Sequence, residues 1–243
     1  MDTASRNGYK VMEKTIRQIS PEIIEISWPA LISKEIAAEM LQLRSSLAEH
    51  LGDRLKDIRL GYHRLSVAIR AGTCQISELR TLLEDLSTGQ RQVSSKRWQI
   101  PVCYDPSLAK DLSPFLKSTG LGLDELIRLH TGVGYLLHFY GFLPGFMYLG
   151  GLVPALHCRR KNFPERKVEK GSVAIGGSQT GIYPVESPGG WHVVGKTPLT
   201  LFDPVSGQLP PFTPGDVIQF FSIARTEYEQ RLGSSVRTLE YEK

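Results

Sequence analysis

Glycine and proline are crowded into one part of this chain. Residues 141–216 hold 13 of the 23 glycines and 10 of the 15 prolines among 243 residues. Glycine lets the backbone adopt positive φ or approach a ligand closely, whereas proline fixes φ and removes a hydrogen-bond donor. We therefore expect this region to fold into short strands joined by tight, rigid turns. Because its conformation is so constrained, it is also where we expect the functional site.

Two stretches of this region carry aromatic residues between the glycines and prolines. Residues 139–151 read FYGFLPGFMYLGG, and residues 171–191 read GSVAIGGSQTGIYPVESPGGW. Rigid loops of this kind hold aromatic rings at fixed positions. We therefore expect Tyr148, Tyr183 and Trp191 to line a pocket. The alternative is that they fill the core, where their hydroxyl and indole N–H groups would still need polar partners.

The first hundred residues alternate between strand and helix patterns. Apolar residues at every second position predict strands near 15–19 and 24–28, and a helix follows Ser33, a candidate N-cap. The next expected elements are strands near 58–60 and 67–69, a helix capped by Ser77, and a strand at 98–102. The order β-β-α-β-β-α-β is typical of an α+β sandwich, and a ferredoxin-like arrangement fits it.

A polar, turn-rich run at residues 86–96 marks the expected domain boundary. The α+β N-terminal domain would then span residues 1–95 and the second domain residues 96–243. Two short helices are expected in the second domain, near 111–119 and 124–130. Short strands then follow at 133–139, 172–175, 192–194, 199–202 and 217–223. Many short strands at this spacing indicate a barrel or a sandwich, so the second domain is expected to be mainly β.

Composition excludes several classes of function. The hydrophobic content is 41%, and no apolar run reaches the roughly 20 residues that span a bilayer. The first residues, MDTASRNGYK, lack the apolar core of a signal peptide, so we expect a cytoplasmic protein without a membrane partner. A net charge of +4 is too small to indicate a nucleic-acid-binding protein. Three scattered cysteines, and histidines without an HExxH or HxH pattern, indicate neither disulfides nor a metal site.

Charge is nevertheless concentrated between the two aromatic stretches. Residues 159–170 contain six basic and two acidic residues, which give this basic segment a net charge of +4. Arg166 lies within it, and its guanidinium would suit a carboxylate or a phosphate; the alternative is a solvated surface charge. His138, next to the first aromatic stretch, is the histidine best placed for proton transfer.

The glycine-rich run 171–178 admits two catalytic interpretations, and neither is complete. It is one residue away from a phosphate-binding P-loop, but Gly177 stands where that motif needs lysine. Ser178 resembles the nucleophile of amidases, yet the sequence does not show which base would approach it. A loop that offers backbone hydrogen bonds is therefore preferred. Asp203 and Asp216 lie in turn contexts, where turn hydrogen bonds explain them without acid–base chemistry.

The same stretches resemble a known family. The runs GFLPGFxYLGGL, GSVxIxGxQTGIYP, SPGGW and TPLxLFDP are similar to those of the B subunit of bacterial 5-oxoprolinase, a family also called allophanate hydrolase subunit 1 or KipI-like kinase inhibitors. The match is dense from about Leu126 to Asp216. The resemblance implies that the second domain is a cyclophilin-like β-barrel, similar to half of the carboxyltransferase module of urea carboxylase. Met147 and Glu165 depart from the family pattern, so an altered pocket rim is expected there.

The resemblance also implies an activity, partners and a set of site residues. Family members open 5-oxoproline to glutamate in an ATP-dependent reaction, in which they act with 5-oxoprolinase subunits C and A; which chain binds ATP stays open. The alternatives are inhibition of a histidine kinase, and a role in allophanate or urea hydrolysis. No catalytic residue is assigned. The residues expected to bind substrate are Tyr148, Arg166, Gln179, Thr180, Tyr183, Ser187 and Trp191.

Overall fold

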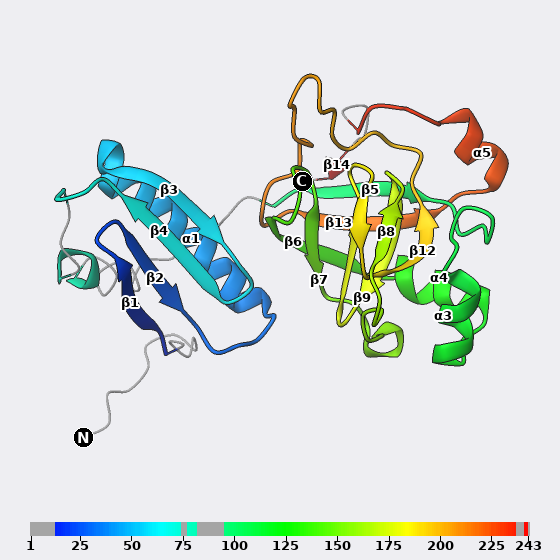
Figure 1. Cartoon of the computed structure of the whole chain (residues 1–243), viewed down its shortest axis with the longest axis horizontal. Coiled ribbons are helices and arrows are strands. Elements are labelled where there is room, and N and C mark those ends of the chain that lie inside the picture. The colour runs from blue at the N-terminus through cyan, green and yellow to red at the C-terminus, as the bar shows by residue number, and fades with distance from the viewer. Residues whose placement is uncertain (1–12, 74–76, 82–94, 237–240, 243) are drawn as a thin grey trace. The chain divides into compact units, whose positions relative to one another are not determined.

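Contacts divide the chain into two compact units, Met1–Val93 and Ser94–Lys243. The computed structural model describes residues 13–73, 77–81, 95–236 and 241–242. Each unit encloses a hydrophobic core of its own. Figure 1 labels helices and strands of both units.

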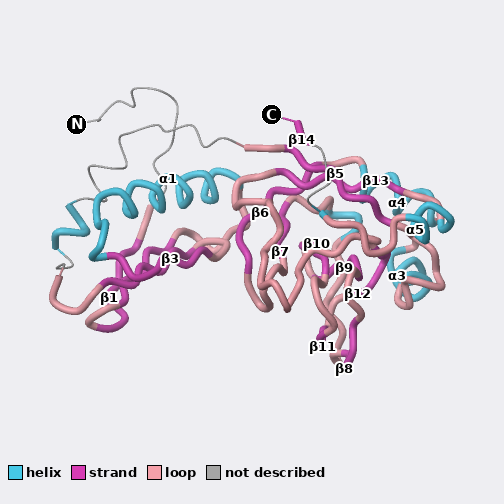
Figure 2. Tube along the Cα trace, turned by 90° about the horizontal axis from the view of Figure 1, so that it is seen from above, coloured by secondary structure: helices cyan, strands magenta, loops and turns pink. Residues whose placement is uncertain are grey.

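The first unit is a four-stranded antiparallel sheet with a helix on one face. Its strands are β1 (Thr15–Ser20), β2 (Ile23–Ser27), β3 (Leu55–Leu60) and β4 (Arg64–Ile69), in the order β1-β2-β4-β3. Figure 2 shows helix α1 (Lys34–Leu51) and these strands as two layers, and the short 3-10 helix η1 (Gly52–Arg54) follows α1. Within the described residues, helix α1 connects β2 to β3, and β4 lies between these two strands in the sheet.

Helix α1 forms where the sequence predicts it. Ser33 has extended backbone angles, and its Oγ accepts hydrogen bonds from the backbone N–H groups of Glu35 and Ile36 at 3.2 and 3.3 Å. This is the N-cap arrangement that satisfies the first free amides of a helix. The predicted apolar positions are all buried in the core of the unit: Ile36, Met40, Leu43 and Leu47. The helix expected after Ser77 is described only over residues 77–81, and its remainder lies outside the described residues.

The second unit is built on one curled sheet of eight strands, in the order β12-β9-β10-β7-β6-β13-β5-β14. Strands β5 and β13 are parallel, and the other neighbours are antiparallel. The bounds are β5 (Arg97–Val102), β6 (Gly134–Tyr140), β7 (Met147–Gly150), β9 (Ser172–Gly176), β10 (Gln179–Ile182), β12 (His192–Lys196), β13 (Val217–Ser222) and β14 (Tyr241–Glu242). This mixed architecture with a curled sheet confirms the expected fold class in outline.

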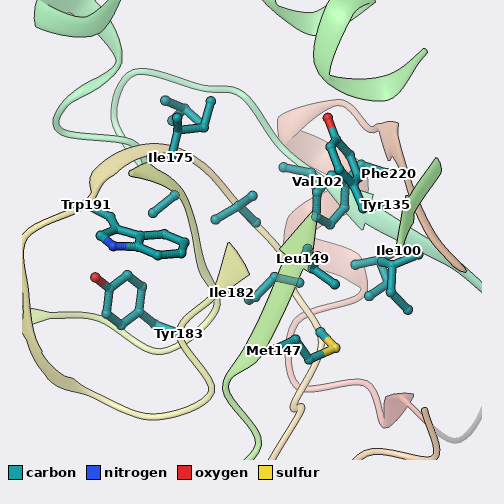
Figure 3. Close-up of a cluster of buried hydrophobic side chains, with 14 of the residues drawn as sticks. Ile100, Val102, Tyr135, Met147, Leu149, Ile175, Ile182, Tyr183, Trp191 and Phe220 are labelled. Carbon is teal, nitrogen blue, oxygen red and sulfur yellow. The ribbon is translucent and has the colours of Figure 1, made fainter. Parts of the chain in front are cut away.

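Strands near opposite ends of the strand order of the curled sheet meet at one point. Cys103, directly after β5, and Lys196, at the end of β12, exchange two backbone hydrogen bonds of 2.9 Å each. This bridge joins β12 to the end of β5 across the curled sheet, and large apolar side chains pack in its interior. Figure 3 shows part of this core, which includes Ile100, Tyr135, Leu149, Ile182 and Phe220.

Short helices and a separate ribbon complete the second unit. The helices are α3 (Leu112–Thr119), α4 (Leu123–Thr131), α5 (Arg225–Gln230) and the 3-10 helix η2 (Pro154–Leu156). The ribbon pairs β8 (Glu165–Val168) with β11 (Ser187–Gly189), and Figure 2 shows it extending away from the curled sheet. No helix in the described part of the chain is long and apolar enough to cross a bilayer.

The strand predicted at 98–102 is present as β5, but it pairs with β13 and β14 of the second sheet and does not complete the N-terminal sandwich. One strand prediction is wrong. Residues 199–202 form no strand, although Leu199 and Leu201 are buried as the alternation suggests. Thr200 makes a single bridge to Ser235, and prolines at positions 198 and 204 lack the amides that a longer ladder would need.

Candidate functional site

An aromatic cluster surrounds Phe146, the residue directly before β7. The Phe146 ring meets those of Tyr148, Tyr183 and Trp191 edge to face, with centroid distances of 5.1, 5.4 and 5.5 Å. Phe139 stacks on Tyr148 at 4.6 Å. Figure 3 shows Tyr183 and Trp191 side by side. The structure thus brings together the three rings that the sequence places in the two aromatic stretches.

Strand alternation places Gln179 on the side of the sheet that carries this aromatic cluster. Gln179 and Gly181 occupy alternate positions of β10 and so face the same side. A Cβ at Gly181 would lie 3.2 Å from Cζ3 of Trp191 and 3.3 Å from Cζ of Phe146, which identifies that side. The Oε1 atom of Gln179 is buried, and within the described part of the chain nothing donates a hydrogen bond to it. A buried acceptor of this kind suits a ligand that brings an N–H group.

Glycines allow the rings to pack directly on the main chain. A Cβ at Gly176 would lie 2.5 Å from Cγ and Cδ1 of Trp191. A Cβ at Gly189 would lie 2.1 Å from the Tyr183 hydroxyl oxygen and 2.7 Å from its Cζ. Both distances are shorter than any tolerated contact, so these two positions require glycine for space rather than for an unusual φ.

Replacing Gly189 with alanine should therefore displace the Tyr183 ring and destabilise the second unit by about 1–3 kcal/mol, as overpacking does. The neighbouring Gly190→Ala is a matched control, because a Cβ there meets no heavy atom closer than 3.8 Å. Its effect should stay within about 1 kcal/mol. Urea unfolding of both variants measures the difference, and equal stabilities would contradict the close packing of Tyr183 on the backbone.

The basic segment is held across the aromatic cluster by backbone hydrogen bonds. Cys158 and Gly177 exchange two such bonds, of 2.7 and 3.1 Å. The amide of Lys161 donates to the Gly190 carbonyl at 2.8 Å. Between these two ties, the guanidinium of Arg160 lies over the indole of Trp191, 5.5 Å from the ring centroid. The site thus combines aromatic rings with a fixed positive charge.

The electrostatics of the aromatic cluster centre on the Tyr183 hydroxyl. Burial raises its pKa, and the backbone amide of Trp191 and the charge of Arg160 partly offset this rise. Tyr183 is therefore a neutral hydroxyl at physiological pH, able to donate or accept a hydrogen bond.

Thr180, next to Gln179, is a buried residue of the core. It is fully buried, and its Oγ1 donates to the Ala174 carbonyl at 3.1 Å and lies 2.9 Å from Nε2 of His130. Because the single hydroxyl hydrogen is used on Ala174, we assign the His130 proton to Nε2; its Nδ1 then accepts from the Tyr104 hydroxyl at 2.7 Å. Burial lowers the pKa of His130 to about 3, so the ring is neutral.

Thr180→Val should destabilise the second unit by about 1–3 kcal/mol, because it leaves the buried His130 N–H without an acceptor. Thr180→Ser keeps the hydroxyl and removes one methyl group, so it should cost less, about 1 kcal/mol. The free energies of unfolding of the two variants in urea test this order. A valine variant as stable as the serine variant would show that the hydrogen bond to His130 contributes nothing.

Comparison with known proteins shows where this arrangement belongs. Residues 14–212 match the family model described as carboxyltransferase domain, subdomain C and D. The chain belongs to this family. The match extends well before Leu126, where the sequence motifs begin, and it confirms the resemblance drawn from them.

Relatives of this carboxyltransferase C/D chain include two proteins that are each called the B subunit of 5-oxoprolinase. The one from Bacillus subtilis (strain 168) is 38% identical over 150 residues, which cover 62% of this chain and 60% of the relative. The one from Escherichia coli O157:H7 is 43% identical over 122 residues, which cover 50% and 56%. The crystal structure of TTHA0988 is similar with a TM-score of 0.73 and 29% identity, and covers 86% of this chain and 40% of its own. The chain thus spans less than two thirds of the length of these proteins.

The remaining predicted site residues of the carboxyltransferase C/D chain lie in different surroundings. Arg166 is exposed on β8. Ser187, at the start of β11, is buried, and nothing in the described residues hydrogen-bonds to its Oγ. His138 is buried in β6, and burial lowers its pKa to about 4. A base this weak accepts a proton poorly at neutral pH, which does not favour a role for His138 in proton transfer.

Met147 and Glu165, where an altered pocket rim is expected, lie in different surroundings. Met147 is fully buried in the core, where Figure 3 shows it. Glu165 is held by ion pairs of 3.1 Å with Lys110 and Lys161, which hold the pKa of its carboxyl below the usual value. The residue that the sequence did not single out is Arg160, because the charge pattern alone did not separate it from Arg166.

The glycine-rich run 171–178 does not fit the triphosphate of ATP. It forms β9 and then a tight hairpin into β10, with Gly177 at a φ of +67°. A P-loop needs a helix after the loop and a lysine within it, and both are missing from this run. Among the described residues there is also no group of three or more His, Cys, Asp or Glu side chains that would hold a metal ion.

Proposed function

We propose that this carboxyltransferase C/D chain is the B subunit of an ATP-dependent 5-oxoprolinase that acts with subunits C and A. The observation that carries the proposal is its identity of 38% and 43% with two proteins of that name. We further propose that the curled sheet is a cyclophilin-like barrel, which the bridge between Cys103 and Lys196 supports. A cytoplasmic location, where ATP is supplied, goes with this activity.

The chemistry of the aromatic cluster suits the proposed substrate. 5-Oxoproline is a small lactam ring with one N–H group and one carboxylate. Tyr183 and Trp191 are buried in the core, so the half-buried ring of Tyr148 would offer the main apolar contact for the lactam ring, with Trp191 beneath it. The Oε1 atom of Gln179 offers an acceptor for its N–H group.

The partner subunits would complete the reaction. Opening the lactam adds water across its C–N bond, and ATP would activate the lactam carbonyl by phosphorylation. The run 171–178 does not fit the triphosphate, and we further propose that the ATP site lies on a partner subunit. This chain would then bind and orient the lactam, and would be inactive alone.

ATP-dependent release of glutamate from 5-oxoproline tests the proposal. The chain is co-expressed with the neighbouring subunits, and the same preparation is made without it. Release that requires the chain is the expected result. An assembled, folded complex that leaves 5-oxoproline and ATP unchanged would overturn the proposal. Autophosphorylation of a histidine kinase at saturating chain, and turnover of allophanate, would then separate the two alternatives within the family.

A further inference from the structure

Arg160, unlike Lys161 and Lys167 of the same basic segment, has no acidic partner within the described residues, and its guanidinium alone in the segment lies over a ring of the aromatic cluster. Lys161 forms ion pairs with Asp111 at 2.7 Å and with Glu165 at 3.1 Å. Lys167 pairs with Glu186 at 3.0 Å. These pairs neutralise the charges of the two lysines that flank Arg160 and Arg166. The guanidinium of Arg160 is left with its full charge for an external anion.

The position of Arg160 is fixed from both sides. His192 Nε2 donates to the carbonyl of Arg159 at 2.9 Å, and the amide of Lys161 donates to Gly190 at 2.8 Å. The side chain itself packs on Trp191, and its positive charge partly offsets the rise that burial causes in the pKa of the Tyr183 hydroxyl. A guanidinium held in this way loses little conformational entropy when it binds a ligand.

Trp191 connects Arg160 to the unpartnered amide oxygen of Gln179. The indole packs on Gly176, and Gly176 is the residue directly opposite Gln179 in the β9–β10 hairpin. The guanidinium lies over the same indole. The guanidinium of Arg160 and the amide oxygen of Gln179 therefore both lie near the Trp191 indole. A small amide that carries a carboxylate needs such a pair, a cation for the carboxylate and an acceptor for the N–H group.

We propose that Arg160 binds the carboxylate of the ligand that the aromatic cluster holds. The proposal deepens the proposed function and rests on it for the identity of the ligand, 5-oxoproline. It assigns to Arg160 the anion-binding role that the sequence suggests for Arg166. Arg160 and Arg166 are both exposed, but within the described residues only Arg160 has its guanidinium over a ring of the aromatic cluster.

A pair of lactams that differ only in the carboxylate tests this role. The ¹⁵N-labelled chain is titrated with sodium 5-oxo-L-proline and with neutral 2-pyrrolidinone at equal ionic strength, while the indole N–H signal of Trp191 is followed. Charged hydrogen bonds of this kind should favour the carboxylate-bearing ligand by roughly 10- to 100-fold. Arg160→Gln should abolish this preference, and Arg160→Lys should keep part of it. Inorganic phosphate is the second anion, and binding as tight as that of 5-oxoproline would overturn the carboxylate assignment.

Arg159→Gln is the matched control, because it removes the same charge from the adjacent exposed position and should leave the preference unchanged. If the assembled complex releases glutamate, its KM for 5-oxoproline tests the role of Arg160. Arg160→Gln should raise this KM roughly 10-fold or more. An unchanged KM would overturn the role of Arg160 and leave the proposed function standing. If the complex is inactive, the titration decides. A carboxylate preference that Arg160→Gln abolishes would then support this role with another substrate, and an absent or unaltered preference would overturn it.

Discussion

Replacing Asp216 with alanine should destabilise the second unit by about 3 kcal/mol or more. Asp216 is only 1% exposed at the start of β13. Its Oδ1 accepts from the Lys96 amide at 3.0 Å, and its Oδ2 accepts from the indole of Trp98 and the amide of Thr213, both at 2.9 Å. The carboxylate therefore joins the turn before β13 to the start of β5. Its removal leaves these three N–H donors without their acceptor.

Asp203→Ala is the matched control for this change. Asp203 is also in a turn, but it is exposed and its Oδ1 accepts one backbone hydrogen bond, from Val205 at 2.9 Å. Its removal should change the free energy of unfolding little. Urea unfolding followed by the fluorescence of Trp98, whose indole contacts Asp216, measures both variants. A loss at Asp216 no larger than that at Asp203 would mean that the buried carboxylate does not hold the two strands together.

Acidification should destabilise the second unit on the order of 4–5 kcal/mol between about pH 7 and pH 4.5. Burial lowers the pKa of His130 from 6.5 to about 3 and that of His138 from 6.5 to about 4. Both imidazoles are therefore neutral in the folded state, whereas the unfolded chain takes up protons once the pH falls below about 6.5. The stabilisation is complete above pH 6.5 and is lost as the pH falls toward the two folded-state values.

Urea unfolding at several pH values, with amide hydrogen exchange of β10 as the local probe, measures this dependence. Each histidine should contribute a slope of at most about 1.4 kcal/mol per pH unit. The single variants His130→Gln and His138→Gln should each remove about half of the total slope, and the double variant nearly all of it. A slope that survives in the double variant would assign the acid sensitivity to other groups.

The sequence was most informative where local chemistry decides the structure. Helix α1 begins at a serine cap and buries apolar residues at helical spacing, so its position could be predicted without knowledge of its partners. Strand β10, with the sequence QTGI, was not predicted because glycine weakens a strand pattern of only four residues. It is stable in the protein because β9 and β7 pair with it on both sides. Strand β14 likewise depends on its pairing with β5.

The candidate site shows the same limit. The grouping of Tyr148, Tyr183 and Trp191 could be predicted, because all three lie in the two glycine- and proline-rich stretches, whose rigid backbone fixes the positions of the rings. Gln179 and Thr180 could not be distinguished, since adjacent residues of a strand face opposite sides and the motif does not show which side is buried. The choice between Arg160 and Arg166 depends on backbone hydrogen bonds between segments that are far apart in the sequence, which no local pattern reveals.

The parallel pairing of β5 with β13 has a consequence for how the second unit folds. Strand β5 opens this unit, yet its partners β13 and β14 lie at its end, and the bridge to Lys196 also comes late. During synthesis the apolar side chains of β5 therefore stay without their partner strands until most of the unit has left the ribosome. Contacts between such distant segments slow folding and prolong the exposure of apolar surface. A chain truncated before residue 217 would lack the partner of β5, so this unit should fold only when its C-terminal strands are present.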